Sequence, residues 1–215
     1  MRLPFPDPIG IEEWPIAIPH FGENLTGSLG LAGSPVGVVL VASDRGCSRH
    51  DPAERALLAG FRRNGFVTVL VDLLLPAEAG DPDQAAWLRL QTAELARRLA
   101  SGRAFVAQRP GLSRLPLVLF GHGAGAAAAV LSARARPAGI AVVIVGGPLP
   151  RGTKQTLDSL RAPLFVVSEM APEACARSAA AWIRSRIVRT GTASPAPASK
   201  PFSSPIPAPS SPSRG

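Results

Sequence analysis

The sequence has few of the residues that build metal sites and disulfide frameworks. It contains only two cysteines and three histidines in 215 residues. Cys47 and Cys175 fit no metal-binding spacing, so we expect free thiols in a reducing compartment. The histidines, at positions 20, 50 and 122, show no paired spacing, which argues against a zinc site. We therefore expect no bound metal and no cofactor.

Long uninterrupted apolar segments are also lacking. The first residues, Met-Arg-Leu-Pro-Phe-Pro-Asp-Pro, do not form the continuous apolar core of a secretory signal. The longest apolar stretch is interrupted by His122 and several glycines, which makes it a poor membrane span. These features predict a cytoplasmic protein without a membrane partner.

Positive charge is abundant, but it is not organised as in nucleic-acid-binding modules. The formal net charge is +8 and the isoelectric point about 11.2. Almost all of this charge comes from arginines scattered over the expected helices, without interleaved aromatic residues. We therefore expect a solvated arginine-rich surface and no specific nucleic-acid partner. The sequence leaves the oligomeric state open.

The hydrophobic pattern predicts one α/β domain with a doubly wound, mostly parallel sheet. Short buried runs alternate with amphipathic helical segments, after a candidate hairpin at the sheet edge. We expect an irregular arm over residues 1–15, the domain over 16–188 and a disordered Pro/Ser/Ala-rich tail over 189–215. The expected strands are 15–21, 25–31, 37–42, 66–73, 115–121, 139–145 and 163–168. The expected helices are 52–63, 83–101 (stopped by Gly102), the alanine-rich helix after the glycine turn that ends near 136, and 172–188.

The stretch from Leu115 to Val130 organises this pattern. An apolar run passes through Gly121-His122-Gly123-Ala124-Gly125 into an alanine run, which predicts a strand, a sharp turn and a helix. Two classes of protein use such a turn. A hydrolase elbow has Gly-x-Ser-x-Gly, whereas a dinucleotide-binding turn has Gly-x-Gly-x-x-Gly or Ala, which Gly121, Gly123 and Ala126 satisfy. The nucleotide alternative also expects an acid about twenty residues later, but the next acid is Asp158.

Several segments resemble the dienelactone-hydrolase-like branch of the α/β-hydrolases. They are the strand Gly-Val-Val-Leu-Val-Ala at 37–42, the loop Gly46-Cys47-Ser48-Arg49-His50-Asp51-Pro52, the strand at 66–72, Leu-Phe-Gly-x-x-x-Gly-Ala-Ala-Ala-Ala at 119–129, Gly146-Gly147, Arg161-Ala162-Pro163 and the closing helix around Trp182. The resemblance implies an α/β-hydrolase sheet and an ester or lactone hydrolase as the ancestral activity.

The chain departs from that family at each part of the catalytic triad. The resemblance places the nucleophile at Gly123, which has no side chain and cannot attack a carbonyl. Glu169 is only a displaced candidate for the acid, no histidine follows His122, and a C-terminal strand is expected to be missing. The loop after the strand at 37–42 begins Ser43-Asp44 instead of His-Gly, and a carboxylate there would oppose an oxyanion. We therefore expect an inactive or impaired hydrolase.

Alternatives remain for the site. An active hydrolase could have a rebuilt site with Cys47 or Ser43 as nucleophile and His50 or His122 as base. Asp51 is more simply a helix cap, and His122 a turn residue bonded to a neighbour. A small-molecule ligand could occupy a crevice at the carboxyl ends of the strands, lined by Ser43, Asp44, Asp72, Gly121–Gly125, Gly146 and Gly147.

Overall fold

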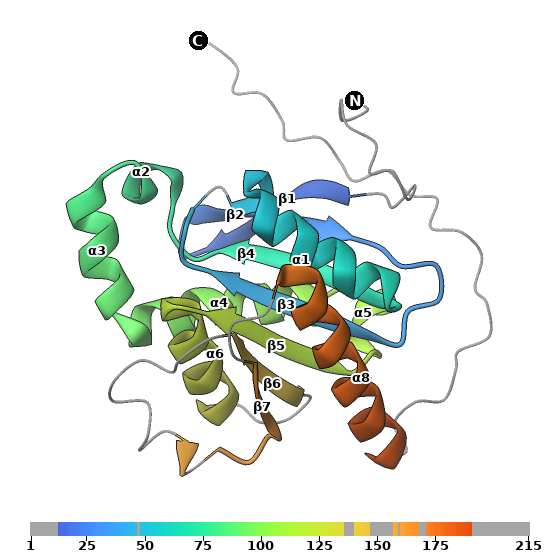
Figure 1. The fold of residues 1–215 in the computed structure, drawn as a ribbon. Coiled ribbons are helices and arrows are strands. Elements are labelled where there is room, and N and C mark those ends of the chain that lie inside the picture. The colour runs from blue at the N-terminus through green and yellow to red at the C-terminus, as the bar shows by residue number, and fades with distance from the viewer. Residues whose placement is uncertain are drawn as a thin grey trace.

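A seven-stranded sheet forms the centre of the molecule, with strand order β1-β2-β4-β3-β5-β6-β7 (Figure 1). The computed structural model describes residues 13–46, 48–135, 140–146, 157–158, 160–167 and 171–190. The strands are β1 (Glu13–His20), β2 (Glu23–Gly30), β3 (Gly37–Ser43), β4 (Phe66–Asp72), β5 (Leu117–His122), β6 (Ile140–Gly146) and β7 (Leu164–Val167). The helices are η1 (Ser48–His50), α1 (Pro52–Arg63), α2 (Pro76–Ala79), α3 (Pro82–Leu90), α4 (Thr92–Ala107), α5 (Pro110–Ser113), α6 (Ala124–Ala135) and α8 (Pro172–Thr190).

The strand directions confirm the predicted mostly parallel sheet. β1 and β2 form an antiparallel hairpin, and β2 also pairs antiparallel with β4. The pairs β4–β3, β3–β5, β5–β6 and β6–β7 are all parallel. Among the described residues β7 is the last strand, and α8 follows it in the chain.

Two hydrophobic layers hold the helices against the sheet. Because side chains alternate along a strand, Val38 and Leu40 of β3 face one layer, whereas Val39 and Val41 face the other. The first layer includes buried residues of α3, α4 and α6. The second includes buried residues of α1 and α8, which lie together over the sheet in Figure 1. Full burial of β3 and β4 explains their uninterrupted apolar sequences.

The prediction of one continuous helix over 83–101 is wrong. The structure has two helices there, α3 and α4, which meet at Gln91 with φ −86° and ψ 63°. α4 also continues through Gly102, which we expected to end it. A Cβ atom at Gly102 would lie 2.8 Å from Val71 Cγ2, so the glycine lets α4 approach the sheet closely. Close packing here outweighs the low helix propensity of glycine.

Both ends of the expected domain also shift. β1 begins at Glu13, inside the arm expected over 1–15, because Glu13 pairs with Gly30 and its carboxylate contacts Arg62 at 3.0 Å. At the other end, α8 reaches Thr190. Residues 1–12 and 191–215, which include most of the predicted arm and tail, lie outside the described residues. In the part of the chain that the structure describes, no helix combines the length and hydrophobicity needed to cross a membrane.

Candidate functional site

A one-residue turn joins β5 to α6. Gly123 stands alone between His122 and Ala124 and has φ +56°, in the left-handed region that favours glycine. Gly125, the next glycine of the motif, lies so close to β3 that no side chain fits. A Cβ at this position would lie 2.2 Å from the carbonyl oxygen of Ala42. The predicted strand, sharp turn and helix are confirmed. We call residues 121–125 the elbow.

The carboxylate of Asp44 lies against this elbow. Its Oδ2 accepts a hydrogen bond of 2.9 Å from the backbone N–H of Ala124, the first residue of α6. A negative charge at a helix N-terminus is favourable because the free N–H groups and the helix dipole point toward it. Arg89 Nε donates to the Asp44 carbonyl oxygen over 3.1 Å and lies 4.0 Å from Oδ2. Asp44 is thus fixed from both its backbone and its side chain.

His122 is the second residue of the elbow, and its side chain pairs with a buried glutamate. Its Nε2 is 2.6 Å from Oε1 of Glu54, whose side chain is 2% exposed. The hydrogen bond to this carboxylate raises the pKa of His122, and the charges of Glu54 and Asp44 act in the same direction against the effect of burial. The geometry therefore favours an imidazolium held by a carboxylate.

Two serines complete the hydrogen-bond network around Glu54. Ser43 Oγ donates to Glu54 Oε1 over 3.2 Å, and the hydroxyl groups of Ser43 and Ser48 are 2.5 Å apart. Glu54 Oε2 is buried without a hydrogen-bond partner among the described residues. Ser43 and His122 thus share one carboxylate, and no hydrogen bond between described residues joins them directly. Their side chains do not form the nucleophile–base pair that Ser43 would need as a nucleophile.

Asp72 orders the loop beside this network. It is fully buried, and its two oxygens accept hydrogen bonds from the Ser48 backbone N–H at 2.9 Å and from Thr26 Oγ1 at 2.8 Å. It also lies opposite Ser43 in the register of β3 and β4. Asp72 therefore ties η1 and β2 to the carboxyl end of β4.

The remaining predicted residues are not all brought together. His50 is exposed at the end of η1, where its Nε2 accepts from Arg49 Nε over 3.0 Å. Asp51 is the N-cap of α1, since its side chain accepts from the N–H groups of Ala53 and Glu54, which confirms that part of the sequence interpretation. Gly146 pairs with His122 in the register of β5 and β6. Cys47, Gly147 and Glu169 lie outside the described residues.

Glu54 is the site residue that the sequence reasoning missed, although a signal was present. It lies at positions i, i+3, i+4 and i+7 with Leu57, Leu58 and Phe61, the buried stripe of α1. Burying a carboxylate on such a stripe costs free energy unless an opposite charge or a hydrogen-bond donor lies beside it. Among the described residues, no group of three or more His, Cys, Asp or Glu side chains is arranged to hold a metal ion.

Comparison with solved structures identifies the fold. A dienelactone hydrolase from Anabaena variabilis superposes with a TM-score of 0.68 at 23% identity, over 82% of this chain and 98% of that one. Est1E from Butyrivibrio proteoclasticus gives 0.60 at 10% identity, over 81% and 99%. The esterase domain of a Rhodothermus marinus protein gives 0.60 at 15%, over 82% and 100%. The chain therefore has the α/β-hydrolase fold, of the kind seen in dienelactone hydrolases and esterases.

Sequence relatives add a second, different name. Proteins from two Mycobacterium tuberculosis strains, CDC 1551 / Oshkosh and H37Rv, are each named "Putative phosphoribosyl transferase" and are 30% identical to this chain over 143 residues. The match covers 66% of this chain and 31% of each relative, so the chain spans about a third of the length of these relatives. No protein-family model matches the sequence.

The His122–Glu54 pair predicts a distinct pH dependence. Because the pKa of His122 is raised in the folded protein, its contribution to the free energy of unfolding is full below the unfolded pKa of about 6.5 and is lost as pH rises through the folded pKa. We expect Glu54→Gln to lower the pKa of His122 in an NMR titration of the imidazole. An unchanged pKa would show that the carboxylate does not control this histidine.

Proposed function

We propose that this chain is a dienelactone-hydrolase-like domain that does not cleave esters and instead serves as a binding scaffold. The observation that carries the proposal is the 2.9 Å hydrogen bond from the Ala124 N–H to the carboxylate of Asp44. In α/β-hydrolases the N–H of the residue after the nucleophile helps to bind the oxyanion of the transition state. Here the carboxylate of Asp44 accepts the hydrogen bond from this N–H group, so the group is occupied.

The residue before Ala124 supports the same conclusion. If the elbow corresponds to that of the hydrolases, Gly123 takes the place of the nucleophile, and it offers no hydroxyl or thiol. A bound oxyanion would also lie beside the negative charge of Asp44, which is the reverse of the stabilisation that acyl transfer needs. The same carboxylate opposes the nucleotide alternative, because a pyrophosphate would have to occupy the N-terminus of α6.

A rebuilt hydrolase is the second candidate, and the His122–Glu54 pair is what favours it. A carboxylate 2.6 Å from one imidazole nitrogen orients the ring as the acid of a catalytic triad does. Cys47 is the nucleophile that this candidate would use, since Ser43 donates its hydroxyl proton to Glu54. The rebuilt hydrolase therefore differs from the binding scaffold in that its function depends on the thiol of Cys47.

The phosphoribosyl transferase name of the mycobacterial relatives contributes less to the proposal than the fold does. That name belongs to proteins of which the match covers 31%, whereas the hydrolase structures are covered over 98% or more of their length in the superpositions given above. The proposal therefore rests on the hydrolase fold and on the contacts of the elbow.

Hydrolysis of p-nitrophenyl acetate by the purified chain distinguishes the two candidates. We expect the wild type, Cys47→Ala and Gly123→Ser all to release nitrophenol at the buffer rate, the last because Asp44 still occupies the Ala124 N–H. Cooperative unfolding of each variant in urea serves as the control for folding. Wild-type hydrolysis that Cys47→Ala abolishes would overturn the scaffold proposal in favour of the rebuilt site.

A further inference from the structure

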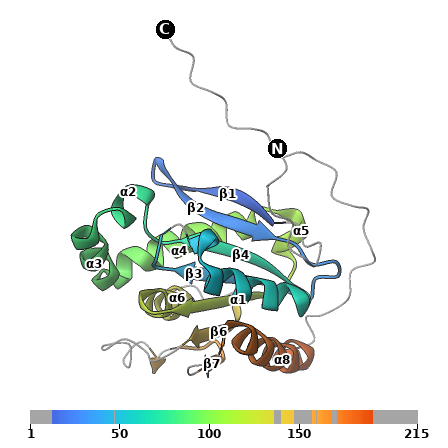
Figure 2. The same ribbon diagram turned by 45° about the horizontal axis from the view of Figure 1, so that its top comes forward.

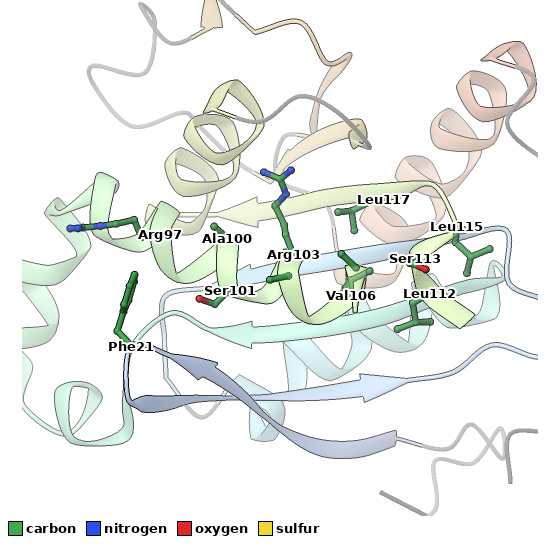
Figure 3. Close-up of a pocket in the computed structure, with 12 residues that line it drawn as sticks. Phe21, Arg97, Ala100, Ser101, Arg103, Val106, Leu112, Ser113, Leu115 and Leu117 are labelled. Atoms are coloured by element: carbon green, nitrogen blue, oxygen red, sulfur yellow. The ribbon is translucent and has the colours of Figure 1, made fainter. Parts of the chain in front are cut away.

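A groove of about 540 Å³ lies along α4, within the size range of small-molecule sites. Its walls come from the turn between β1 and β2, from α4, and from the segment that includes α5 and the start of β5 (Figure 3). None of the residues that line it belongs to the elbow or to the network around Glu54. The groove is therefore separate from the site described above.

One end of the groove is formed by an unusual aromatic residue. Phe21 is 90% exposed and has φ +44°, and Gly22 after it has φ +88°. Two consecutive positive φ values define a tight hairpin turn in which asparagine and glycine are the favoured residues. A phenylalanine is strained in this backbone conformation while it buries almost no surface. Residues in strained backbone conformations cluster at active sites and ligand-binding sites.

The hairpin turn is held in place against α4. His20, beside Phe21, is buried, and its Nδ1 is 2.9 Å from Ser101 Oγ. The two rings of His20 and Phe21 are in edge contact with centroids 4.9 Å apart. Phe21 is thus positioned at the groove by a buried neighbour, although its own side chain is exposed.

The groove carries positive charge and no acidic lining residue. Arg97 lies beside Phe21 in Figure 3, and its side chain is 66% exposed. It contacts Glu94 Oε2 at 2.7 Å, but the same carboxylate also contacts Arg98 at 3.1 Å and His20 at 3.6 Å. Arg103 is directed toward α6, where it donates to the Ser132 carbonyl oxygen over 3.0 Å. Arg97 is therefore paired with Glu94, and a ligand carboxylate in the groove would share this guanidinium with Glu94.

The opposite end of the groove is apolar. Val106, Leu112, Leu115 and Leu117 line it, and Figure 3 shows these leucines at the end away from Phe21 and Arg97. The groove thus has an aromatic and a cationic side chain at one end and aliphatic side chains at the other. A molecule with one anionic end and a flexible apolar body matches this order of groups.

We propose that this groove binds a free long-chain carboxylate. The carboxylate accepts hydrogen bonds from Arg97, Phe21 covers the first methylene groups, and the chain extends along α4 toward Leu112 and Leu115. A charge-assisted hydrogen bond fixes the orientation of the ligand, and burial of the chain supplies affinity. This binding function does not depend on whether the elbow is catalytic.

Calorimetric titration with laurate below its critical micelle concentration tests the carboxylate contact. We expect saturable binding of one laurate, and a Kd about tenfold higher for Arg97→Gln, because a hydrogen bond to a charged group is lost. Arg177→Gln is the matched control, since Arg177 is exposed on α8, which packs on the other layer. Dodecanol has the same chain without the charge, so its affinity should not respond to Arg97→Gln.

The Phe21→Asn variant separates ligand binding from folding. Asparagine suits the left-handed turn, so we expect the midpoint of thermal unfolding to rise by about 2 °C, while the Kd for laurate rises about fivefold through loss of the aromatic contact. Absence of laurate binding, equal effects of Arg97→Gln and Arg177→Gln, or binding only to phosphatidylglycerol vesicles would each overturn the proposal. Esterase measurements are unaffected by these outcomes.

Discussion

Replacing Glu78 with alanine is expected to destabilise the fold by about 3–5 kcal/mol. Glu78 and Arg98 are both buried and make two hydrogen bonds, from Nη1 to Oε2 at 2.5 Å and from Nη2 to Oε1 at 2.8 Å. Arg98 Nη1 also donates to the Leu73 carbonyl oxygen at 2.8 Å. The variant would remove the two-point partner of a guanidinium that is always charged, and would leave it with Glu94, 3.1 Å from Nε, as its carboxylate partner.

Urea denaturation measures this loss, and a surface pair provides the control. Glu173→Ala breaks the contact between Arg63 and Glu173, whose side chains are 38% and 62% exposed, and should change the free energy of unfolding by at most about 1 kcal/mol. The double variant Glu78→Leu/Arg98→Met should recover most of the lost stability, since it removes both charges together. Similar losses for Glu78→Ala and Glu173→Ala would contradict the assignment of a buried ion pair.

The same pair has a defined pH dependence. Hydrogen bonds from Arg98 hold the pKa of Glu78 below its usual value. A lowered carboxyl pKa contributes stability that is present above the unfolded pKa of about 4.3 and is lost as pH falls through the folded pKa. The difference in stability between wild type and Glu78→Ala should therefore shrink toward acid pH, opposite in sign to the contribution of His122.

The regular elements could be predicted because their signals are local. Continuous apolar runs identified β3 and β4, and Asp51-Pro52 identified the start of α1. The break at Gln91 and the passage of α4 through Gly102 could not be predicted, since both depend on how α4 packs on the sheet. The mostly parallel, doubly wound sheet followed from the alternation of strands and helices and from the family resemblance, whereas the order of the strands was observed only in the structure.

The site was harder to predict from the sequence, because its contacts also depend on tertiary packing. The glycines of the elbow are visible as a motif, but the partner of the Ala124 N–H lies 80 residues away in the chain. The pairing of His122 with Glu54 spans 68 residues. A sequence pattern can show that Glu54 occupies an apolar stripe, but only the packing of α1 beside β5 identifies the imidazole that neutralises it. Long-range polar contacts are decided by tertiary packing.

Gly123→Ala is expected to lower the free energy of unfolding by about 1–3 kcal/mol. Part of this loss comes from the positive φ of 56°, which costs a residue with a Cβ about 1–2 kcal/mol. The rest comes from Asp44, because a Cβ at this position would lie 3.0 Å from Oδ2. That contact is tighter than ordinary van der Waals distance, so the carboxylate must shift and weaken its bond to the Ala124 N–H.

A double-mutant cycle in urea isolates the contribution of Asp44. Asp44→Ala alone should cost about 0.5–2 kcal/mol through loss of the hydrogen bond at the N-terminus of α6. Combining it with Gly123→Ala should cost less than the sum of the two single variants by more than about 0.5 kcal/mol, because the close contact is then absent. Additive losses would show that Asp44 does not restrict the elbow. With a positive coupling, a serine at position 123 could be accommodated only after Asp44 is removed.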